Sequence, residues 1–180
     1  MQNVVDQIRY DHISMSRILL LIEKELVKLK TEGTADFNLL LDCMRYMIEY
    51  ADIAHHPKED AMMDCIYGRL PELDKVIDEI KFQHGSIAEK SVAFSDLINA
   101  ATLEQFVAKE KIVTSGQRYV SMQRKHIRLE EESLLRKLKT LLTQDDETEI
   151  NEMYSKYWDP QLEDNFEKEY NSLYRALIDG

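Results

Sequence analysis

The sequence predicts an all-α protein, an antiparallel up-down four-helix bundle with a short helical C-terminal extension. Apolar residues recur every three to four positions along four long segments, which is the period of an amphipathic helix. Only five Gly and three Pro occur in 180 residues, and Val, Ile and Thr do not gather into the alternating runs of strands. This length is enough for one domain with a core of its own.

Four segments carry the helical pattern, and together they assign residues 1–142 to the bundle. Their predicted ranges are 3–30, 37–67, 72–99 and 102–142. Gly33 is a natural stop for the first helix, and Pro71 suits the first turn of the third. Thr102 and Gln105 resemble a capping box that opens the fourth helix, and Gly116 is expected to bend or split that helix.

Pro57 interrupts the second helix. Proline lacks the amide hydrogen that would bond the carbonyl of Ile53, and its ring crowds that carbonyl. A proline inside a helix costs about 3 kcal/mol, so we expect a kink or bulge here. Two interpretations are open: the distortion re-aims functional side chains, or it is a surface kink without a function.

Residues 143–180 form the predicted extension. A short helix begins near Asp145, and Asp159 and Pro160 have the pattern of an N-cap followed by a first helical residue. An aromatic and apolar stripe follows at positions Leu162, Phe166, Tyr170, Leu173 and Leu177. We expect this stripe to pack on the end of the bundle or on a second subunit, which leaves a homodimer open.

Charge and composition exclude several classes of function. The net charge is −11 and the pI is about 4.9, which argues against nucleic acid or an anionic membrane surface as the main partner. No apolar run approaches the roughly 18 residues of a membrane span, and the first residues lack the apolar core of a signal peptide. Cys43 and Cys65 form no CxxC motif, so we interpret them as buried free thiols in a reducing cytoplasm.

Two pairs of histidine and glutamate repeat the same spacing on different predicted helices. His55 and Glu59 are four residues apart, and so are His126 and Glu130. Residues four apart share one helical face, with Cβ atoms roughly 5–6 Å apart. A neutral imidazole and a carboxylate at this distance can bind one metal ion or lie side by side on a pair of ions.

His12 and His84 lie in the apolar stripes of the first and third helices. A single histidine in such a stripe is usually a hydrogen-bonded core residue. Four of them, one on each helix, are harder to explain in this way, because burial of four imidazoles and two carboxylates without a metal carries a large desolvation cost. The pattern therefore favours a metal site inside the bundle.

The residue types also restrict the metal. Imidazole and carboxylate ligands without a thiolate disfavour a structural zinc site and suit iron or manganese. The ferritin-like class of di-iron bundle uses Glu-x-x-His with the acid first. Here Gln123 occupies the position three before His126, so that signature fails on the fourth helix.

The order and spacing of these residues resemble those of the hemerythrin-like family, also called the HHE cation-binding family. The resemblance spans residues 1 to about 142, and the tail around Trp158 is similar to the tails of bacterial members. The matching pieces are Asp11-His12, His55-His56-Pro57-Lys58-Glu59-Asp60, Gln83-His84 and His126-Ile127-Arg128-Leu129-Glu130-Glu131.

The resemblance implies a centre of two non-haem iron ions. His12 and His55 would serve one iron, and His84 and His126 would serve the other. Glu59 and Glu130 would each bridge both ions, with an oxo or hydroxo oxygen from solvent between them. Glu131 is the runner-up to Glu130, because respiratory hemerythrins use a five-residue spacing there. Zinc or manganese are substitutes to consider, since the order of affinities places zinc above iron(II).

Three further residues qualify this comparison. His56 lies about 100° around the helix from His55, so we expect it at the surface or outside the ligands, although the kink at Pro57 could turn it inward. Ala88 stands where respiratory hemerythrin has a second histidine on the third helix, so by our count about two of the twelve positions on two octahedral irons stay open. Tyr119 either lines the pocket or, as we favour, is a buried structural residue.

The family resemblance implies a cytoplasmic protein of bacterial type that binds or senses O2 or NO, or that responds to iron and to oxidative or nitrosative stress. Two other classes stay open. The first is an enzyme that degrades peroxide or NO or donates iron to damaged iron–sulfur clusters, which steady turnover would reveal. The second is a non-catalytic helical interaction protein with structural histidines, which would purify without metal.

Overall fold

Helices make up most of the part of the chain that the computed structural model describes, which is residues 3–103, 105–155 and 173. This confirms the predicted all-α class for those residues, and no strand occurs among them. The elements are α1 (Val4–Glu32), α2 (Phe37–Tyr46), η1 (Met47–His55), α3 (His56–Ile66), α4 (Pro71–Thr102), α5 (Lys109–Leu129), η2 (Glu130–Leu135), α6 (Arg136–Leu141) and α7 (Gln144–Ser155). The two segments η1 and η2 are π-helical.

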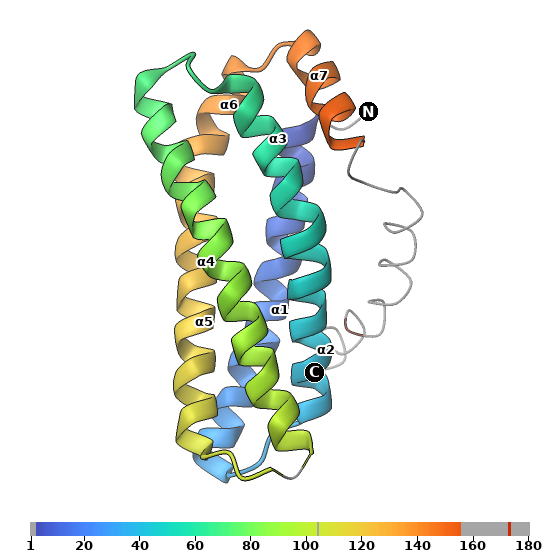
Figure 1. Cartoon of the computed structure of the whole chain (residues 1–180), viewed down its shortest axis with the longest axis vertical. Coiled ribbons are helices and arrows are strands. Elements are labelled where there is room, and N and C mark those ends of the chain that lie inside the picture. Colours follow the sequence, from blue (N-terminus) through green and yellow to red (C-terminus); the bar gives the residue numbers. More distant parts are fainter. Residues whose placement is uncertain (1–2, 104, 156–172, 174–180) are drawn as a thin grey trace.

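Four long helical rods lie side by side along the longest axis of the molecule (Figure 1). The rods are α1, the continuous run α2–η1–α3, α4, and the continuous run α5–η2–α6. Each π-helical segment therefore lies inside a rod and does not end it. This arrangement brings residues that are far apart in the sequence to the same height in the molecule.

The rods begin and end largely where the sequence predicts. Gly33 follows α1 with a φ of 78°, a left-handed conformation that glycine adopts without strain. The Asp36 side chain caps α2 by accepting a hydrogen bond of 2.9 Å from the amide of Leu39. Pro71 is the first residue of α4, where its missing amide hydrogen costs nothing.

Two predictions on the fourth rod are wrong. Thr102 does not open a helix but ends α4, and its hydroxyl donates to the carbonyl of Asn99. Gly116 does not split the helix, because α5 runs unbroken from Lys109 to Leu129. A Cβ atom at residue 116 would lie 2.5 Å from Leu26 Cδ1 and 2.7 Å from Phe94 Cζ. The role of Gly116 is to allow close packing against neighbouring helices.

The distortion expected near Pro57 takes the form of the π-helical segment η1. The amide of His56 donates to the carbonyl of Ala51, five residues earlier, instead of the usual four. Pro57 then lies in the first turn of α3, where it has no hydrogen bond to lose. A π-helical turn changes the direction of the side chains that follow it, so it bears directly on where His55 and His56 point.

The core consists of two apolar clusters at different heights of the bundle. One cluster includes Met15 and Leu19 of α1 and Ile98 of α4, and the other includes Ile8 of α1 and Ile77 of α4. On the first three rods the predicted metal ligands fall in sequence between the members of the two clusters, and on the fourth rod Glu130 does, whereas Ile127 of the first cluster follows His126. A layer of buried polar side chains therefore separates two apolar halves.

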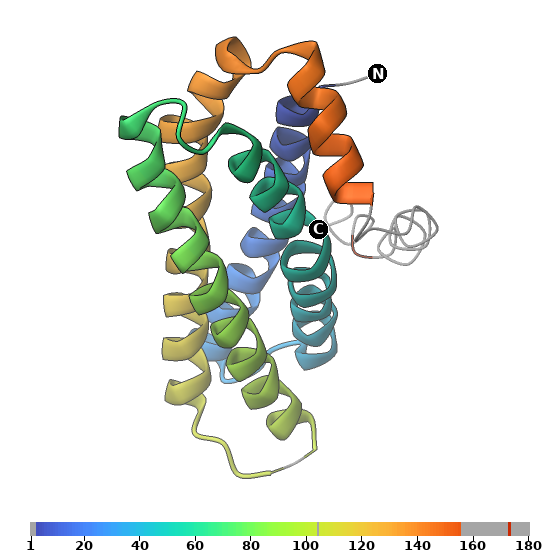
Figure 2. The ribbon, with the colours of Figure 1, turned by 45° about the horizontal axis from the view of Figure 1, so that its top comes forward.

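The short helix α7 belongs to the predicted extension and packs on α3, with Ile150 fully buried. Figure 2 shows it across the end of the bundle where α1 begins. Thr143 and Asp146 cap each other reciprocally at its start, and Arg69 donates to both carboxylate oxygens of Asp146. Leu173 is buried in the first apolar cluster.

Two other predictions concern the extension and the thiols. The stripe from Leu162 to Leu177, apart from Leu173, and the cap at Asp159 and Pro160 lie outside the described residues. Both cysteines are free thiols, but only Cys43 is buried as predicted, because Cys65 is half-buried beside α7. Among the helices that the structure describes, none has the length and apolar character needed to cross a membrane.

Candidate metal centre

The structure brings all six predicted ligands together in the polar layer. Each rod supplies one histidine, and the second and fourth rods add a glutamate each. All six side chains are buried, and none is more than 8% exposed. They are His12 of α1, His55 at the end of η1, Glu59 of α3, His84 of α4, His126 of α5 and Glu130 at the start of η2.

One group of donor atoms forms where α1 meets the second rod. The Nε2 atoms of His12 and His55 each lie 3.4 Å from Oε1 of Glu59. Oε2 of Glu130 lies 3.3 Å from Nε2 of His12. Two imidazoles and one oxygen from each carboxylate therefore surround a common point.

A second group uses the other oxygen of each carboxylate. Oε2 of Glu59 lies 3.5 Å from Nε2 of His84, and Oε1 of Glu130 lies 3.5 Å from Nε2 of His84 and 3.2 Å from Nε2 of His126. Each carboxylate thus presents one oxygen to each group. Two carboxylates placed in this way could each contact both of two neighbouring cations.

The distances between these donor atoms fit metal coordination. Two ligands at about 2.1 Å from one ion lie about 3.0 Å apart in an octahedral site and about 3.4 Å apart in a tetrahedral one. The observed separations of 3.2–3.5 Å agree with this spacing.

Each of the four imidazoles is held at Nδ1 by an acceptor outside the group of ligands. The pairs are His12 with Glu131 (2.9 Å), His55 with Asp11 (3.1 Å), His84 with Asp60 (3.1 Å) and His126 with Gln83 (3.1 Å). A carboxylate or amide oxygen only accepts, so Nδ1 carries a hydrogen and Nε2 is the nitrogen left to face a metal ion. Partners of this kind orient histidines toward a metal.

The donor atoms that face the centre make no hydrogen bonds within the described part of the chain. The Nε2 atoms of the four histidines and all four oxygens of Glu59 and Glu130 are buried without a hydrogen-bond partner. Burying a polar atom in this way costs about 1–3 kcal/mol, and proteins rarely leave several together. These residues therefore fit one or two bound cations, which would occupy the unused lone pairs.

The pKa values of the centre indicate that positive charge beside the buried carboxylates is favourable. Burial alone would raise the pKa of Glu59, but the neighbouring His55, His12 and His84 lower it well below its usual range. Burial alone would lower the pKa of His84, but the hydrogen bond to Asp60 and the nearby carboxylates of Glu130 and Glu59 raise it to about 11. In a metal-free chain, protons on the imidazoles supply the charge that the carboxylates require; bound cations would supply it instead.

The structure also shows where the residues lie whose roles the sequence left open. Glu130 is fully buried and faces the imidazoles, whereas Glu131 is 33% exposed and accepts from Arg9 and His12 Nδ1. Tyr119 is buried away from the donor atoms and shares hydrogen bonds with Ser91 and Gln123. Burial raises the pKa of Tyr119 above its ordinary value, so it stays a neutral phenol.

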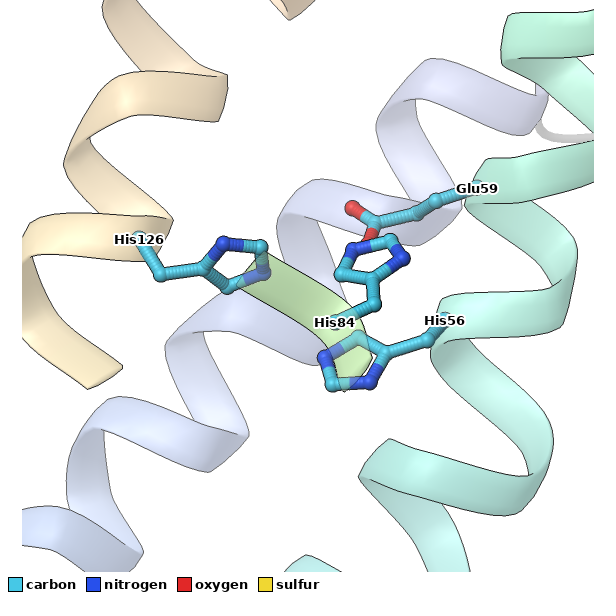
Figure 3. A group of neighbouring side chains, drawn as sticks. All are labelled: His56, Glu59, His84 and His126. Atoms are coloured by element: carbon cyan, nitrogen blue, oxygen red, sulfur yellow. The ribbon is translucent and has the colours of Figure 1, made fainter. Parts of the chain in front are cut away.

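His56 departs from the expected surface position. Its side chain is only 4% exposed, and its ring lies with His84, His126 and Glu59 in Figure 3. The alternative, that the distortion at Pro57 turns it inward, is the one the structure shows. The geometry of a regular α-helix does not predict that His56 is buried. The His-His-Pro sequence was the available indication, because Pro57 disturbs the helix at this point.

Sequence reasoning also missed most of the acceptors that hold the imidazoles. Each acceptor is the direct neighbour of a ligand on its own rod but holds the histidine of another rod. Asp11 precedes His12 and holds His55, while Gln83 precedes His84 and holds His126. The polar residue beside each ligand was the available signal.

A comparison with curated proteins gave no match. A comparison with family profiles matched the hemerythrin HHE cation-binding domain over residues 3–138, which includes every residue of the centre. This match covers most of the chain and coincides with the four rods that carry the donor atoms. The protein therefore belongs to the hemerythrin HHE cation-binding domain family.

Proposed function

We propose that the protein holds two non-haem iron ions in the polar layer of an antiparallel four-helix bundle. In this proposal His12 and His55 bind one ion, His84 and His126 bind the other, and Glu59 and Glu130 bridge them. The observation that carries it is the convergence of buried imidazole nitrogens and carboxylate oxygens without hydrogen-bond partners. Imidazole and carboxylate ligands without a thiolate suit iron or manganese.

We infer that the physiological role is to bind or sense O2 or NO. The ligands lie deep between two apolar clusters, so only a small molecule would reach them. Bound iron supplies the redox and ligand-binding chemistry. The protein residues would hold the imidazoles in one tautomer and exclude bulk water. The two free thiols agree with a reducing bacterial cytoplasm as the setting.

The decisive experiment is a metal analysis combined with an absorption spectrum. The chain is loaded anaerobically with iron(II), its metal content is measured, and the spectrum is recorded before and after exposure to air and to NO. We expect about two irons per chain and new bands at about 330–380 nm after air. Substoichiometric metal with no oxygen-dependent band would refute the di-iron proposal and favour an interaction protein.

A pair of matched variants tests the assignment of the bridge. Glu130→Gln removes a charge from the buried centre, and we expect it to lower the bound iron to less than two per chain. Glu132→Gln makes the same change at an exposed position two residues away and should leave the metal content unchanged. Steady consumption of peroxide or NO by the iron-loaded parent would instead establish the enzymatic alternative.

A further inference from the structure

We propose that His56 is a fifth imidazole ligand of the centre, on the ion that His84 and His126 serve. This inference rests on the proposed function and extends its ligand set. It assigns adjacent residues of one rod, His55 and His56, to the two different ions. The centre would then be unequal, with three imidazoles on one ion and two on the other.

The position of the ring is the first observation. The His56 ring stacks on that of His84, with centroids 4.1 Å apart and planes 14° apart, and meets the His126 ring edge-on at 5.4 Å. One donor atom from each of these residues and one from Glu59 all lie within 4.8 Å of one another. The three rings and the carboxylate gather at one place in Figure 3.

The spacing of the rings fits shared coordination. Two imidazoles bound through Nε2 at about 2.1 Å to one ion, in neighbouring octahedral positions, have centroids about 4.6 Å apart. The three separations among His56, His84 and His126 are 4.1, 5.0 and 5.4 Å, which bracket this value. The proposed pair His12 and His55 has centroids 5.0 Å apart and planes 67° apart, whereas the planes of His56 and His84 are only 14° apart, so one of these two rings would turn when both bind one ion.

The hydrogen bonding of His56 is the second observation. Its Nδ1 lies 3.4 Å from Oδ1 of Asp52, one turn earlier on the same rod. Its Nε2 is buried without a hydrogen-bond partner, as are the Nε2 atoms of the other four histidines. A merely structural buried histidine would be expected to satisfy both ring nitrogens. His56 shares the unpartnered Nε2 of the other four histidines, although its Nδ1 contact is longer than their Nδ1 hydrogen bonds of 2.9–3.1 Å.

The backbone explains how two consecutive residues reach the centre. In an α-helix they would point about 100° apart, and one of them would leave the core. The bond from the His56 amide to the Ala51 carbonyl widens this turn, and Pro57 has no amide hydrogen to restore the ordinary pattern. His55 consequently faces His12, and His56 faces His84.

The extra ligand predicts where a small molecule binds. The ion near His84 would receive three imidazoles and one oxygen from each of Glu59 and Glu130. The ion near His12 would receive two imidazoles and the remaining two oxygens. It has one protein ligand fewer, so O2, NO or azide would bind there.

The test counts coordinated histidines without reference to activity. The chain has five histidines, and selective 15N-histidine labelling makes each Nδ1–H visible by nuclear magnetic resonance. The protein is loaded anaerobically with cobalt(II), whose unpaired electrons strongly shift the signals of bound imidazoles. We expect five shifted, exchangeable Nδ1–H signals in the parent protein. Four shifted signals and one ordinary histidine signal would overturn the proposal.

Variants identify the fifth signal. His56→Phe keeps a ring of similar size, and we expect four shifted signals and cobalt affinity that is at least about ten-fold weaker. Tyr119→Phe changes another buried ring and should retain all five signals. Unchanged cobalt affinity in His56→Phe would refute the inference, and the parent count decides the question even if this variant does not fold.

The same measurements separate this inference from the proposed function. If the parent protein binds fewer than two metal ions and shows no shifted histidine signal, the di-metal centre itself is wrong. If it binds two ions with four shifted signals, the centre stands and only the role of His56 is wrong.

Discussion

At the scale of single residues, the centre depends on the acceptors that hold each imidazole from behind. Asp11 shows this most clearly, because one carboxylate accepts from His55 Nδ1 and from the Tyr50 hydroxyl at 2.7 Å, with Lys58 Nζ at 3.8 Å. Burial alone would raise the pKa of Asp11, but these neighbours lower it below its ordinary value. Asp11 therefore stays ionised and fixes the hydrogen of His55 on Nδ1.

Asp11→Asn tests this positioning role. An amide keeps the shape but removes the charge that fixes the tautomer of His55, so we expect metal affinity to fall by about 10–100-fold. Competition with a chelator of known affinity measures the change. Asp42→Asn, at a position whose side chain is 52% exposed, is the matched control. Equal affinities in the two variants would show that the imidazole is held by packing alone.

At the scale of elements, the extension is fastened by the cap of α7. Arg69 and the amide of Thr143 hold the pKa of Asp146 well below its usual range. A carboxyl whose folded pKa is lowered stabilises the folded state above its unfolded pKa of about 3.9, and this contribution is lost as the pH falls below that value. The attachment of α7 to α3 is therefore sensitive to acid.

We expect Asp146→Asn to destabilise the protein by about 1 kcal/mol near pH 7. The difference between parent and variant should shrink as the pH falls below about 4, because the unfolded parent then binds a proton at this carboxyl that the folded parent does not. Denaturant unfolding at several pH values measures it, and hydrogen exchange of the α7 amides locates it. A difference that does not depend on pH would show that Asp146 acts only through packing.

Gly116 offers a second prediction at this scale. Ala is the better helix former by about 1 kcal/mol, yet a Cβ at residue 116 would collide with Leu26 and Phe94. Overpacking typically costs 1–3 kcal/mol, so we expect Gly116→Ala to lower the thermal midpoint by several degrees.

The control for this prediction is Gly85→Ala. It also lies inside a long helix, but nothing lies within 4 Å of the added Cβ. We expect this variant to stabilise the metal-free chain by up to about 1 kcal/mol. If both variants stabilise the chain, the close approach at Gly116 is less tight than described.

These elements also show what could be predicted from the sequence. The period of the apolar residues predicted the four rods, and the spacing of His55 and Glu59 predicted that these two side chains share one helical face. Both features depend only on local helix geometry. The buried position of the His56 side chain could not be predicted from helical period. It depends on a π-helical segment, and the packing of the whole rod determines whether such a segment forms. Gly116 was misjudged because its partners, Leu26 and Phe94, come from other helices.

At the scale of the whole molecule, a polar layer divides the apolar core. The two clusters could each pack on their own, but the layer between them holds two carboxylates and five imidazoles with unused donor atoms. Unpartnered buried groups oppose folding. Bound cations would convert this layer from a destabilising one to a stabilising one.

Metal removal should therefore lower stability measurably. A ligand that binds only the folded state stabilises it by about 2.7 kcal/mol when its free concentration is 100 times Kd. We expect chelation to lower the thermal midpoint by roughly 5–10 °C and to increase hydrogen exchange around the layer more than in either apolar cluster. Identical melting curves with and without metal would contradict the view that ions complete this core.

Because the ligands are spread over four rods, metal binding and folding should occur in a particular order during synthesis and refolding. His12 lies 119 positions before Glu131, the residue that holds its ring, and no single rod offers more than one or two histidines and one glutamate. A partly assembled chain would therefore capture ions only weakly. Metal uptake would follow the meeting of all four rods, and its rate in a refolding experiment would report the final step of assembly.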